Sequence, residues 1–537
     1  MKKLYITMLA SAALLTACDM DQLPEGGMLT EDQKNEVVAD NAEKIAGDLN
    51  ALKDKLIQYG IVSTSASTYH FDYGFPSICL MYDQAGQDMV SENDGYNWFS
   101  GALTLSDRIP TDTDNELIWK LHYQHIMTAN SILTKMYADY TEEERVDEIA
   151  NYIGQALASR AFDYLQLIQT YQFTYQGHEQ SLGLPIITEK TTVDEANNNP
   201  RATVQAVYDL IMADLNQAVE YLEAYPISRQ DAAQITAEVA HGLRARANML
   251  LGNYAEAAAD ADAAMEGYAP YSMDEVSVPS FNDASASSWI WGSVITSNND
   301  VVTTGIINWP SHLCSLTGNG YTTGTGTNTV YKRLNVNLWN RIPASDVRKT
   351  WWVDEDLQSE ALNKAYGSDG PILGEYLGYL PYTNVKFGPE AGVVLNTENS
   401  QDWPLMRVEE MLLIKAEALA RSQGVAAGKS VLESFLKTYR DPNYTCAASS
   451  LEDFIDEVWF QRRIELWGEG FSMFDILRLK KPIVRKGANF SANVTYEDIA
   501  PESGIMIFCI PECETSANKG ISADQINEVA TPPVPMM

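Results

Sequence analysis

Residues 461–478 read QRRIELWGEGFSMFDILR, a stretch that combines helical spacing with a high density of charge. The apolar positions predict one helix over residues 451–467 and a second over residues 471–478. Both signs of charge occur close together here, and charges that are buried in a protein need partners. We therefore expect an internal ion-pair network that involves Arg462, Arg463, Glu465, Glu469 and Asp475.

The basic residues continue past this stretch, although the chain as a whole is acidic. The 537 residues include 37 basic and 73 acidic side chains, which gives a formal charge of −36. An internal network is one explanation for this local run of positive charge, and contact with a protein partner or with lipid headgroups is the other. The run comprises Arg478, Lys480, Lys481, Arg485 and Lys486.

Helical spacing extends over much of the remaining chain. It predicts helices at about 30–60, 115–140, 141–171, 203–224, 236–251, 253–266, 403–422 and 428–440. The pair over 236–266 partly matches the 34-residue tetratricopeptide (TPR) repeat, since its turn and second helix fit but its first helix has polar residues at apolar positions. The sequence therefore predicts a mostly α fold that contains degenerate TPR-like hairpins.

Two long segments, about 61–113 and 270–400, lack this spacing. They are rich in Gly, Ser, Thr, Asp and aromatic residues, and residues 317–327 form a Gly/Thr-rich loop. Short strands are expected at 289–291 and 392–395, and the last fifty or so residues are expected to form loops and short strands. Irregular segments of this length commonly carry function, so we place the binding site there.

Composition excludes several classes of protein. Apolar residues make up 45% of the chain, which is too many for a disordered or collagen-like protein. The acidic balance argues against nucleic-acid binding, because that needs a basic surface to displace counterions. Binding to anionic membrane surfaces is disfavoured for the same reason.

The N-terminus has the features of a bacterial lipoprotein signal. Two lysines precede an apolar run that ends at Ala17 and is too short to span a bilayer. The order Leu15-Thr16-Ala17-Cys18 is that of a lipobox, in which Cys18 is lipidated. We therefore expect a signal peptide over residues 1–17, a lipidated and flexible tether over 18–30, and one α-helical domain over 31–537.

Several motifs together resemble the SusD/RagB-like outer-membrane lipoproteins of Bacteroidetes. Residues 461–478 are similar to the family pattern Arg-Arg-x-Glu-Leu followed by Glu-Gly-x-x-x-x-Asp-Leu-x-Arg. Further similar segments occur in the same order as in the family, at 119–130, 342–349, 407–411 and 510–514. The resemblance covers essentially the whole mature chain.

The resemblance implies a platform of TPR-like hairpins with the ligand site on loops. It also implies a lipid-anchored protein on the cell surface that captures glycans and delivers them to a SusC-like TonB-dependent transporter, without catalysis. A peptide-binding RagB-like lipoprotein is the first alternative, and a surface glycosidase is the second. No HExxH or GxSxG motif occurs, and the P-loop-like residues 424–430 lack one residue between their glycines.

The ligand site is expected on loops at residues 82–99 and 296–340. A sugar presents C–H faces and hydroxyl edges, so its binder needs exposed aromatic rings flanked by amides and carboxylates. Family members carry ligand-contacting aromatic residues in these two regions. Our candidates are Trp98 and Trp309 as aromatic platforms, Asn93, Asn97 and Asp88 as hydrogen-bonding partners, and Tyr96 and Tyr321 as further contacts. The alternative for Trp98 is burial beneath the first long helix.

We expect no cofactor, and bound Ca²⁺ is the one alternative that we keep. Alternating carboxylates at Asp112, Asp114 and Glu116 suit Ca²⁺, although Asp114 could simply cap the following helix. His122 and His125 lie one helical turn apart, and we interpret them as packed core residues rather than metal ligands. The other cysteines are interpreted as mostly free thiols with at most one or two bridges: Cys79, Cys314, Cys446, Cys509 and Cys513.

Overall fold

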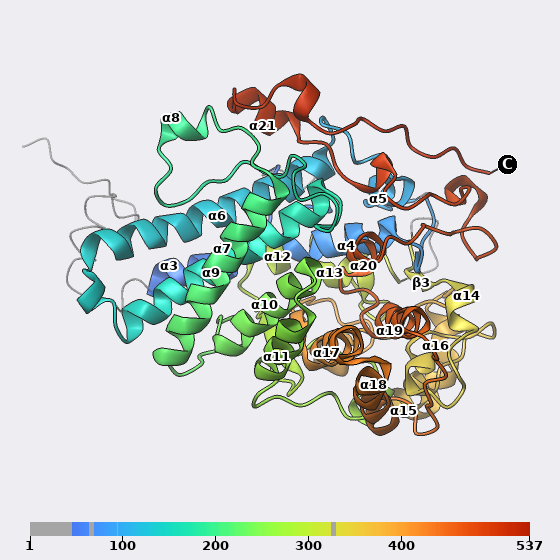
Figure 1. Ribbon diagram of the computed structural model, residues 1–537. Helices are drawn as coiled ribbons and strands as arrows, with labels where there is room; N and C mark the ends of the chain where they lie inside the picture. Colours follow the sequence, from blue (N-terminus) through green and yellow to red (C-terminus); the bar gives the residue numbers. More distant parts are fainter. Residues whose placement is uncertain (1–45, 64–68, 94, 324–328, 537) are drawn as a thin grey trace, which may run out of the picture. The chain divides into compact units, whose positions relative to one another are not determined.

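Long helices account for most of the regular structure, as the spacing predicts (Figure 1). The computed structural model describes residues 46–63, 69–93, 95–323 and 329–536. The proposed signal peptide, Cys18, the tether and the start of the first long helix lie outside these residues. The longer helices are α3 (Ala46–Lys55), α4 (Phe75–Ala85), α6 (Thr113–Asp139), α7 (Glu148–Tyr171), α9 (Val204–Ala224), α10 (Ala237–Leu251), α11 (Tyr254–Ala264), α17 (Val408–Gln423), α18 (Val425–Tyr439) and α19 (Leu451–Glu465).

Successive long helices pack against one another as an array of hairpins. Helix α7 packs on α6 and α9, α10 packs on α9 and α11, and α17 packs on α18 and α19. The turn between α10 and α11 contains Gly252, whose φ of 84° is readily adopted only by glycine. The prediction of a mostly α fold with TPR-like hairpins is confirmed.

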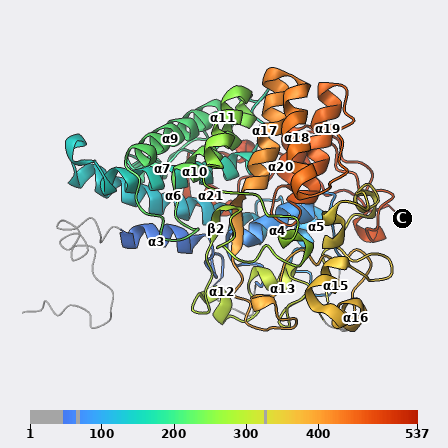
Figure 2. The ribbon, with the colours of Figure 1, turned by 90° about the horizontal axis from the view of Figure 1, so that it is seen from below.

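The segment 270–400 interrupts this array without breaking its packing. Helices α11 and α17 lie against each other although about 140 residues separate them in sequence. Figure 2 shows them side by side, with the interrupting segment on the other side of α4. Its elements are short: α12 (Asp300–Thr303), α13 (Trp309–Leu313), α14 (Val336–Trp339), α15 (Glu360–Tyr366), α16 (Gly370–Tyr376), and 3₁₀ turns at 275–277, 347–351, 367–369 and 390–392.

Two small antiparallel ladders connect distant parts of the chain. Strand β1 (Met89–Val90) pairs with β3 (Arg333–Leu334), and β2 (Trp289–Ser293) pairs with β4 (Trp403–Arg407). The predicted strand at 289–291 is therefore confirmed. The β2–β4 ladder joins the two ends of the interrupting segment, so this segment leaves and re-enters the helical array at one place.

The structure corrects four boundaries, each for a local backbone reason. Residues 403–407 form a strand rather than a helix, because Pro404 holds the preceding residue in an extended conformation. The expected helix over 141–171 breaks at Asp147, where φ is +51°. Residues 392–395 form turns rather than a strand, since Gly392 and Leu395 have positive φ. The last fifty residues contain no strand among those described, and form instead α21 (Glu512–Ala517) and 3₁₀ turns at 492–494, 504–506 and 523–525.

The charged stretch contributes to ion pairs buried inside the protein. Four cations and four carboxylates form what we call the central charge network, and every side chain in it is at most 3% exposed: Asp346, Arg348, Lys386, Arg407, Glu409, Arg440, Glu465 and Glu469. Arg440 bonds to Glu465 (Nε–Oε2, 2.9 Å) and to Glu409 (Nη2–Oε1, 2.9 Å). Despite burial, which acts in the opposite direction, the three arginines hold the pKa of Glu465 well below its usual range.

The helix that ends this stretch, α20 (Ser472–Arg478), packs against α4. Gly470 permits this approach: its φ is +89°, and a Cβ placed there would lie 2.7 Å from the Cβ of Cys79. Arg462 pairs with Asp475 (Nε–Oδ2, 2.7 Å), and Arg463 pairs with Asp88 (Nε–Oδ2, 2.8 Å). The expected internal ion-pair network is thus confirmed.

Much of the basic run that follows is also bound within the chain. Arg485 is 1% exposed and donates to the carbonyl oxygens of residues 84, 85 and 86, at the C-terminal end of α4, and to that of residue 103. A cation at this end of a helix satisfies carbonyl groups that have no partner within the helix. Lys481 pairs with Asp456, and Lys480 pairs with Glu502.

Candidate functional site

The two loop regions that were expected to carry the site meet in the structure. The β1–β3 ladder pairs Met89 with Leu334 and Val90 with Arg333, and so joins the first expected region to the second. The short helix α5 (Ser100–Thr104) follows directly after the first of these regions. Within this region, rings from three separate segments come together.

We call the group of His70, Tyr96, Trp98, His312 and Tyr321 the aromatic cluster. His70 stacks on Trp98 with ring centroids 4.5 Å apart, and Tyr321 stacks on His312 at 4.7 Å. Tyr96 and Tyr321 join the two predicted loops, with centroids 5.9 Å apart. A hydrogen bond links Nδ1 of His70 to the hydroxyl of Tyr321. The cluster is therefore a continuous set of rings.

Exposure differs across the aromatic cluster. Tyr96 is 49% exposed, Trp98 is partly exposed, and Tyr321 is 9% exposed. Burial raises the pKa of the Tyr321 hydroxyl to about 12, so it remains protonated at neutral pH. Tyr96 and Trp98 thus lie on the exposed side of the cluster: Trp98 stacks on His70, and Tyr96 lies against Tyr321, which in turn stacks on the buried His312.

The candidate asparagines and Asp88 mainly organise the loop. Asn97 is 9% exposed; its Nδ2 donates to the carbonyl of Glu92 (2.8 Å) and its Oδ1 accepts from the amide of residue 99. Asn93 is partly exposed and accepts a hydrogen bond from Ser100 (2.6 Å). Asp88 is 4% exposed, and its carboxylate pairs with Arg463. This ion pair joins the residue before β1 to α19. Of these three candidate side chains, Asn93 alone is partly exposed.

The expectation that Trp309 provides an exposed platform is wrong in this structure. Trp309 begins α13 and is 2% exposed, with its Nε1 donating to the carbonyl of Gln401 (2.9 Å). Its ring packs against Trp403 and Phe387, at 5.2 and 5.6 Å between centroids. Helix α13 turns this side chain toward the core, and a loop position in the sequence does not reveal that orientation.

Three residues of this region were missed by the sequence reasoning: His70, His312 and Lys332. The two histidines belong to the aromatic cluster, and Lys332 is 1% exposed beside it. Burial lowers the pKa of Lys332 to about 7, and burial with the nearby Lys332 charge lowers the pKa of His312 well below its usual range. No spacing rule marks these residues, because they come from segments far apart in the sequence.

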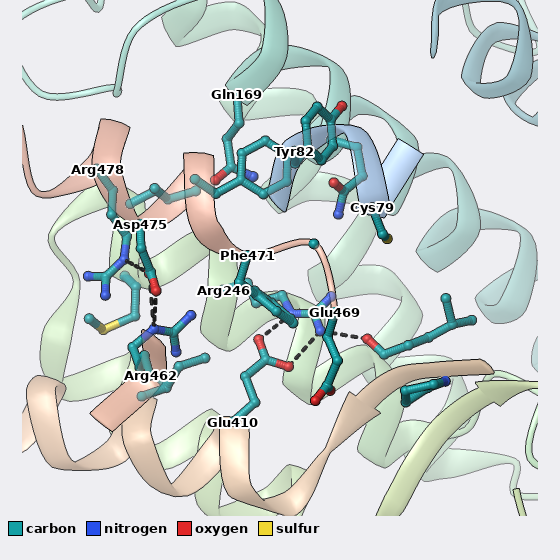
Figure 3. A pocket seen from close by; sticks show the side chains of 18 of the residues that line it. Cys79, Tyr82, Gln169, Arg246, Glu410, Arg462, Glu469, Phe471, Asp475 and Arg478 are labelled. Carbon is teal, nitrogen blue, oxygen red and sulfur yellow. Dashed lines mark hydrogen bonds and ion pairs between the residues drawn. The ribbon is translucent and has the colours of Figure 1, made fainter. Parts of the chain in front are cut away.

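A concave region lies within the helical array. We call it the helical pocket: a cavity of about 70 Å³ between α4, α7, α10, α17 and α20. Figure 3 shows Phe471 and Tyr82 on its walls, together with the ion pairs Arg246–Glu410 and Arg462–Asp475. A wider depression of about 520 Å³, the helical groove, shares four lining residues with the pocket, and its lining includes residues from α10, α11, α17, α19 and α20.

No group of three or more metal-ligating side chains is found in the described part of the chain. His122 and His125 both bond to Asp163 through Nδ1, at 2.8 and 2.7 Å, in the buried interface of α6 and α7. Asp112, rather than Asp114, caps α6 by accepting from the amide of Asp114. The five described cysteines are free thiols. None of the described helices combines the length and the apolar composition that a membrane span requires.

Comparisons with known proteins give a consistent result. Residues 31–247 match a family model described as "Starch-binding associating with outer membrane", and residues 310–521 match the model of the SusD family. No curated protein matches the chain. Among solved structures, a SusD-like carbohydrate binding protein from Bacteroides vulgatus is 22% identical, with 91% of this chain and 99% of that chain covered and a TM-score of 0.74.

Two further solved structures have the same fold. A SusD superfamily protein from Bacteroides thetaiotaomicron is 21% identical over 90% of this chain and 99% of its own, with a TM-score of 0.69. Surface glycan-binding protein A from the same organism, solved in complex with laminarihexaose, is 17% identical over 89% of this chain and 98% of its own, with a TM-score of 0.61.

Proposed function

Because the chain belongs to the SusD/RagB-like family, we propose that it is a glycan-binding lipoprotein of the bacterial cell surface. In this proposal it captures oligosaccharides and delivers them to a SusC-like TonB-dependent transporter, without catalysing a reaction. The observation that carries the proposal is the aromatic cluster, in which the exposed ring of Tyr96 lies against Tyr321 and the partly exposed Trp98 stacks on His70.

The chemistry of the cluster suits a sugar. The faces of Tyr96 and Trp98 offer flat apolar surface for the C–H groups of a pyranose ring, and Asn93 offers amide groups for its hydroxyls. Tyr321 and His70 hold these rings in place through stacking and through their mutual hydrogen bond. The stacking limits ring motion, and a preorganised site loses less entropy when a ligand binds.

Binding without catalysis is supported by the state of the neighbouring carboxylates. Hydrolysis of a glycosidic bond uses two carboxyl groups on either side of that bond. Asp88 is bound to Arg463, and Glu92 is bound to Arg333, so both are committed to ion pairs. We therefore assign these two carboxylates to loop structure rather than to acid–base chemistry.

Calorimetric titration with oligosaccharides tests this proposal. Maltoheptaose and laminarihexaose are the first probes, chosen from the descriptions of the matched family and of one structural neighbour. We expect saturable binding of at least one member of a neutral glycan panel and no release of reducing ends. Binding of peptides alone would favour the RagB-like alternative, and glycan cleavage by the purified protein would contradict the proposal.

Membrane attachment through Cys18 is part of the same proposal. The chains attached to a bacterial lipoprotein cysteine provide more apolar anchorage than a single acyl chain, which binds membranes only weakly. The Cys18→Ala protein is expected to leave the membrane fraction. External protease should degrade the wild-type protein on whole cells, and affinity purification from native membranes should recover a TonB-dependent transporter. A Cys18→Ala protein that stays in the membrane would contradict this anchor.

A further inference from the structure

His241 joins three consecutive helices of the helical array. It lies on α10, which packs on both α9 and α11 (Figure 2), and it is 8% exposed. Its Nδ1 lies 2.8 Å from a carboxylate oxygen of Asp260 on α11, and its Nε2 lies 2.8 Å from a carboxylate oxygen of Glu223 on α9. The imidazole ring therefore bridges two acidic side chains that belong to different helices.

The two hydrogen bonds require the charged form of this ring. An ionised carboxylate only accepts hydrogen bonds, and a neutral imidazole has one N–H donor, whereas the imidazolium has two. Both nitrogens of His241 can therefore donate only when the ring is protonated. Burial lowers the pKa of His241, but the hydrogen bonds to Asp260 and Glu223 outweigh burial and raise this pKa above its ordinary value.

Asp260 keeps other partners when the ring loses a proton. Its carboxylate also accepts from Arg244 (Nη2–Oδ1, 2.7 Å) and from Nδ2 of Asn248 (3.0 Å). The arginine stays protonated, so Asp260 remains paired with a cation at any pH that the protein meets. The Asp260 side chain is only 6% exposed, and a buried carboxylate pays heavily for each donor that it loses. A neutral His241 is therefore expected to keep its remaining proton on Nδ1.

Glu223 is the partner that the neutral ring gives up. In the described part of the chain, His241 is its one cationic partner, and the Glu223 side chain is 57% exposed, so water can solvate it. Glu223 is also the second-last residue of α9 (Val204–Ala224), where the helix carbonyls carry partial negative charge that disfavours a carboxylate. The contact between α9 and α10 thus depends on the proton.

Few other charges influence this ring. The charged groups that act on it are Asp260 from α11, Glu223 from α9, and Arg244 from its own helix. Strand β2, which also packs on α10, has no titratable side chain. Glu220, Glu238 and Glu256 are partly or fully exposed to solvent. Other charges of α7, α11 and α17 are held in pairs of their own: Arg160–Asp214, His122–Asp163, His125–Asp163, Arg246–Glu410 and Lys415–Asp262.

We propose that His241 is a proton-dependent clamp in the helical array: its charged form ties α9 to α10 and α11, and loss of the proton frees Glu223 and loosens the last turn of α9. The loosening is local, because Asn151 of α7 donates to the carbonyl of Tyr225 just beyond this turn (2.9 Å). The array is thus held most tightly under mildly acidic conditions. The clamp shares no residue with the aromatic cluster and does not depend on the proposed glycan binding.

Histidine NMR on the purified mature protein tests the clamp. The protein has six histidines, and the signal of His241 is identified by its absence from His241→Gln. We expect His241 to titrate above the ordinary histidine pKa of about 6.5, and to titrate lower in Glu223→Gln than in the wild type. Glutamine fits either state of the ring, because its amide both accepts and donates. Glu220→Gln, at an exposed position of the same helix, is the matched control and should leave the titration nearly unchanged.

Hydrogen exchange measures the loosening itself. After correction for the intrinsic effect of pH, the amides of residues 220–225 in the wild type should exchange roughly two- to tenfold faster at pH 9 than at pH 6, which corresponds to the loss of one hydrogen bond. Glu223→Gln should lack this change, and Glu220→Gln should behave as the wild type.

Unfolding in urea gives a further measure. A pKa that is raised in the folded state stabilises the protein while the ring is protonated, and this contribution is lost as the pH rises through the folded-state pKa. The wild type should therefore be more stable than Glu223→Gln at pH 6, and the difference should disappear by pH 9. The pH dependence that arises from Lys332 is common to both proteins and cancels in this difference.

Four results would overturn the inference. They are a wild-type His241 that titrates at or below the ordinary value, a titration in Glu223→Gln that equals that of the wild type, exchange of residues 220–225 that does not change with pH, and a stability difference that is the same at pH 6 and pH 9. Glycan binding by Glu223→Gln should equal that of the wild type, so failure of this inference is distinguishable from failure of the proposed function.

Discussion

The central charge network and the aromatic cluster are both built from distant segments, but they are held together by different forces. The network places eight charged groups in the core, where each ion depends on its partners. The aromatic cluster joins rings whose centroids lie 4.5–5.9 Å apart, some stacked and some tilted, and leaves part of two rings open to solvent. Loss of one member should therefore unfold the first region, whereas in the second it should mainly weaken binding.

The largest effect is expected from Glu465→Ala. This change removes the carboxylate that bonds to Arg440 and faces Arg348 and Arg407, so three buried cations lose a partner. Breaking a buried ion pair on one side costs about 3–5 kcal/mol. The urea midpoint of the variant measures this loss, with Lys437→Ala as the control, because the Lys437–Glu433 pair is exposed. A loss below about 1 kcal/mol would show that the network is not essential for stability.

The next largest effect concerns Trp98 and is an effect on affinity. Trp98→Ala should weaken glycan binding at least about tenfold, since an aromatic anchor at a binding hot spot contributes about 2 kcal/mol or more. The melting temperature should change little, because this ring is partly exposed. Trp309→Ala is the matched comparison: its ring is 2% exposed, so it should lower stability by about 3–5 kcal/mol. Wild-type affinity in Trp98→Ala would place the site elsewhere.

A smaller effect, and one that depends on pH, is expected from Lys332→Met. Burial lowers the folded-state pKa of Lys332 to about 7, while the unfolded chain keeps the ordinary lysine value. Between these values the unfolded state binds the extra proton, so the stability of the wild-type protein rises with pH above about 7. The variant should be more stable at pH 7 by about 1–3 kcal/mol and should lose this slope.

Urea titrations at pH 7 and pH 9.5 measure the difference between the wild type and Lys332→Met. Lys190→Met is the control, because the Lys190 side chain is 86% exposed. Equal pH slopes in the wild type and Lys332→Met would mean that Lys332 is solvated in the folded protein. His312 acts at lower pH: its folded-state pKa is lowered, so its contribution to stability falls as the pH drops below its ordinary pKa of about 6.5.

The smallest effect is expected from Tyr321→Phe, which keeps the ring and removes the hydroxyl that bonds to His70. One hydrogen bond contributes about 0.5–1.5 kcal/mol, so affinity for the glycan should fall about two- to tenfold. Tyr376→Phe, on the exposed side of α16, should not change affinity. A loss as large as that of Trp98→Ala would mean that Tyr321 bonds to the ligand directly.

The sequence predicts the ion pairs of residues 461–478 better than the aromatic cluster, for a physical reason. Arg462 and Asp475 lie close in sequence and their buried charges must be compensated nearby, so local spacing is informative, whereas six of the eight members of the central charge network lie outside this stretch. The cluster instead depends on His70, Trp98 and Tyr321, whose proximity follows from the pairing of β1 with β3. Trp98 and Trp309 look equivalent in the sequence, and only the turn of α13 separates a partly exposed ring from a buried one.

The hydrogen bonds from Arg485 to the end of α4 also affect the order in which the protein can fold as it is synthesised. The carbonyls of residues 84–86 leave the ribosome about 400 residues before the guanidinium that binds them. The carboxylate of Asp83 likewise accepts hydrogen bonds from the amides of residues 470 and 472, which are synthesised much later. Contacts between residues far apart in the sequence form late, and they slow folding. Helix α4 therefore gains these bonds only after about nine-tenths of the chain has been synthesised, so this part of the fold closes when synthesis is nearly finished.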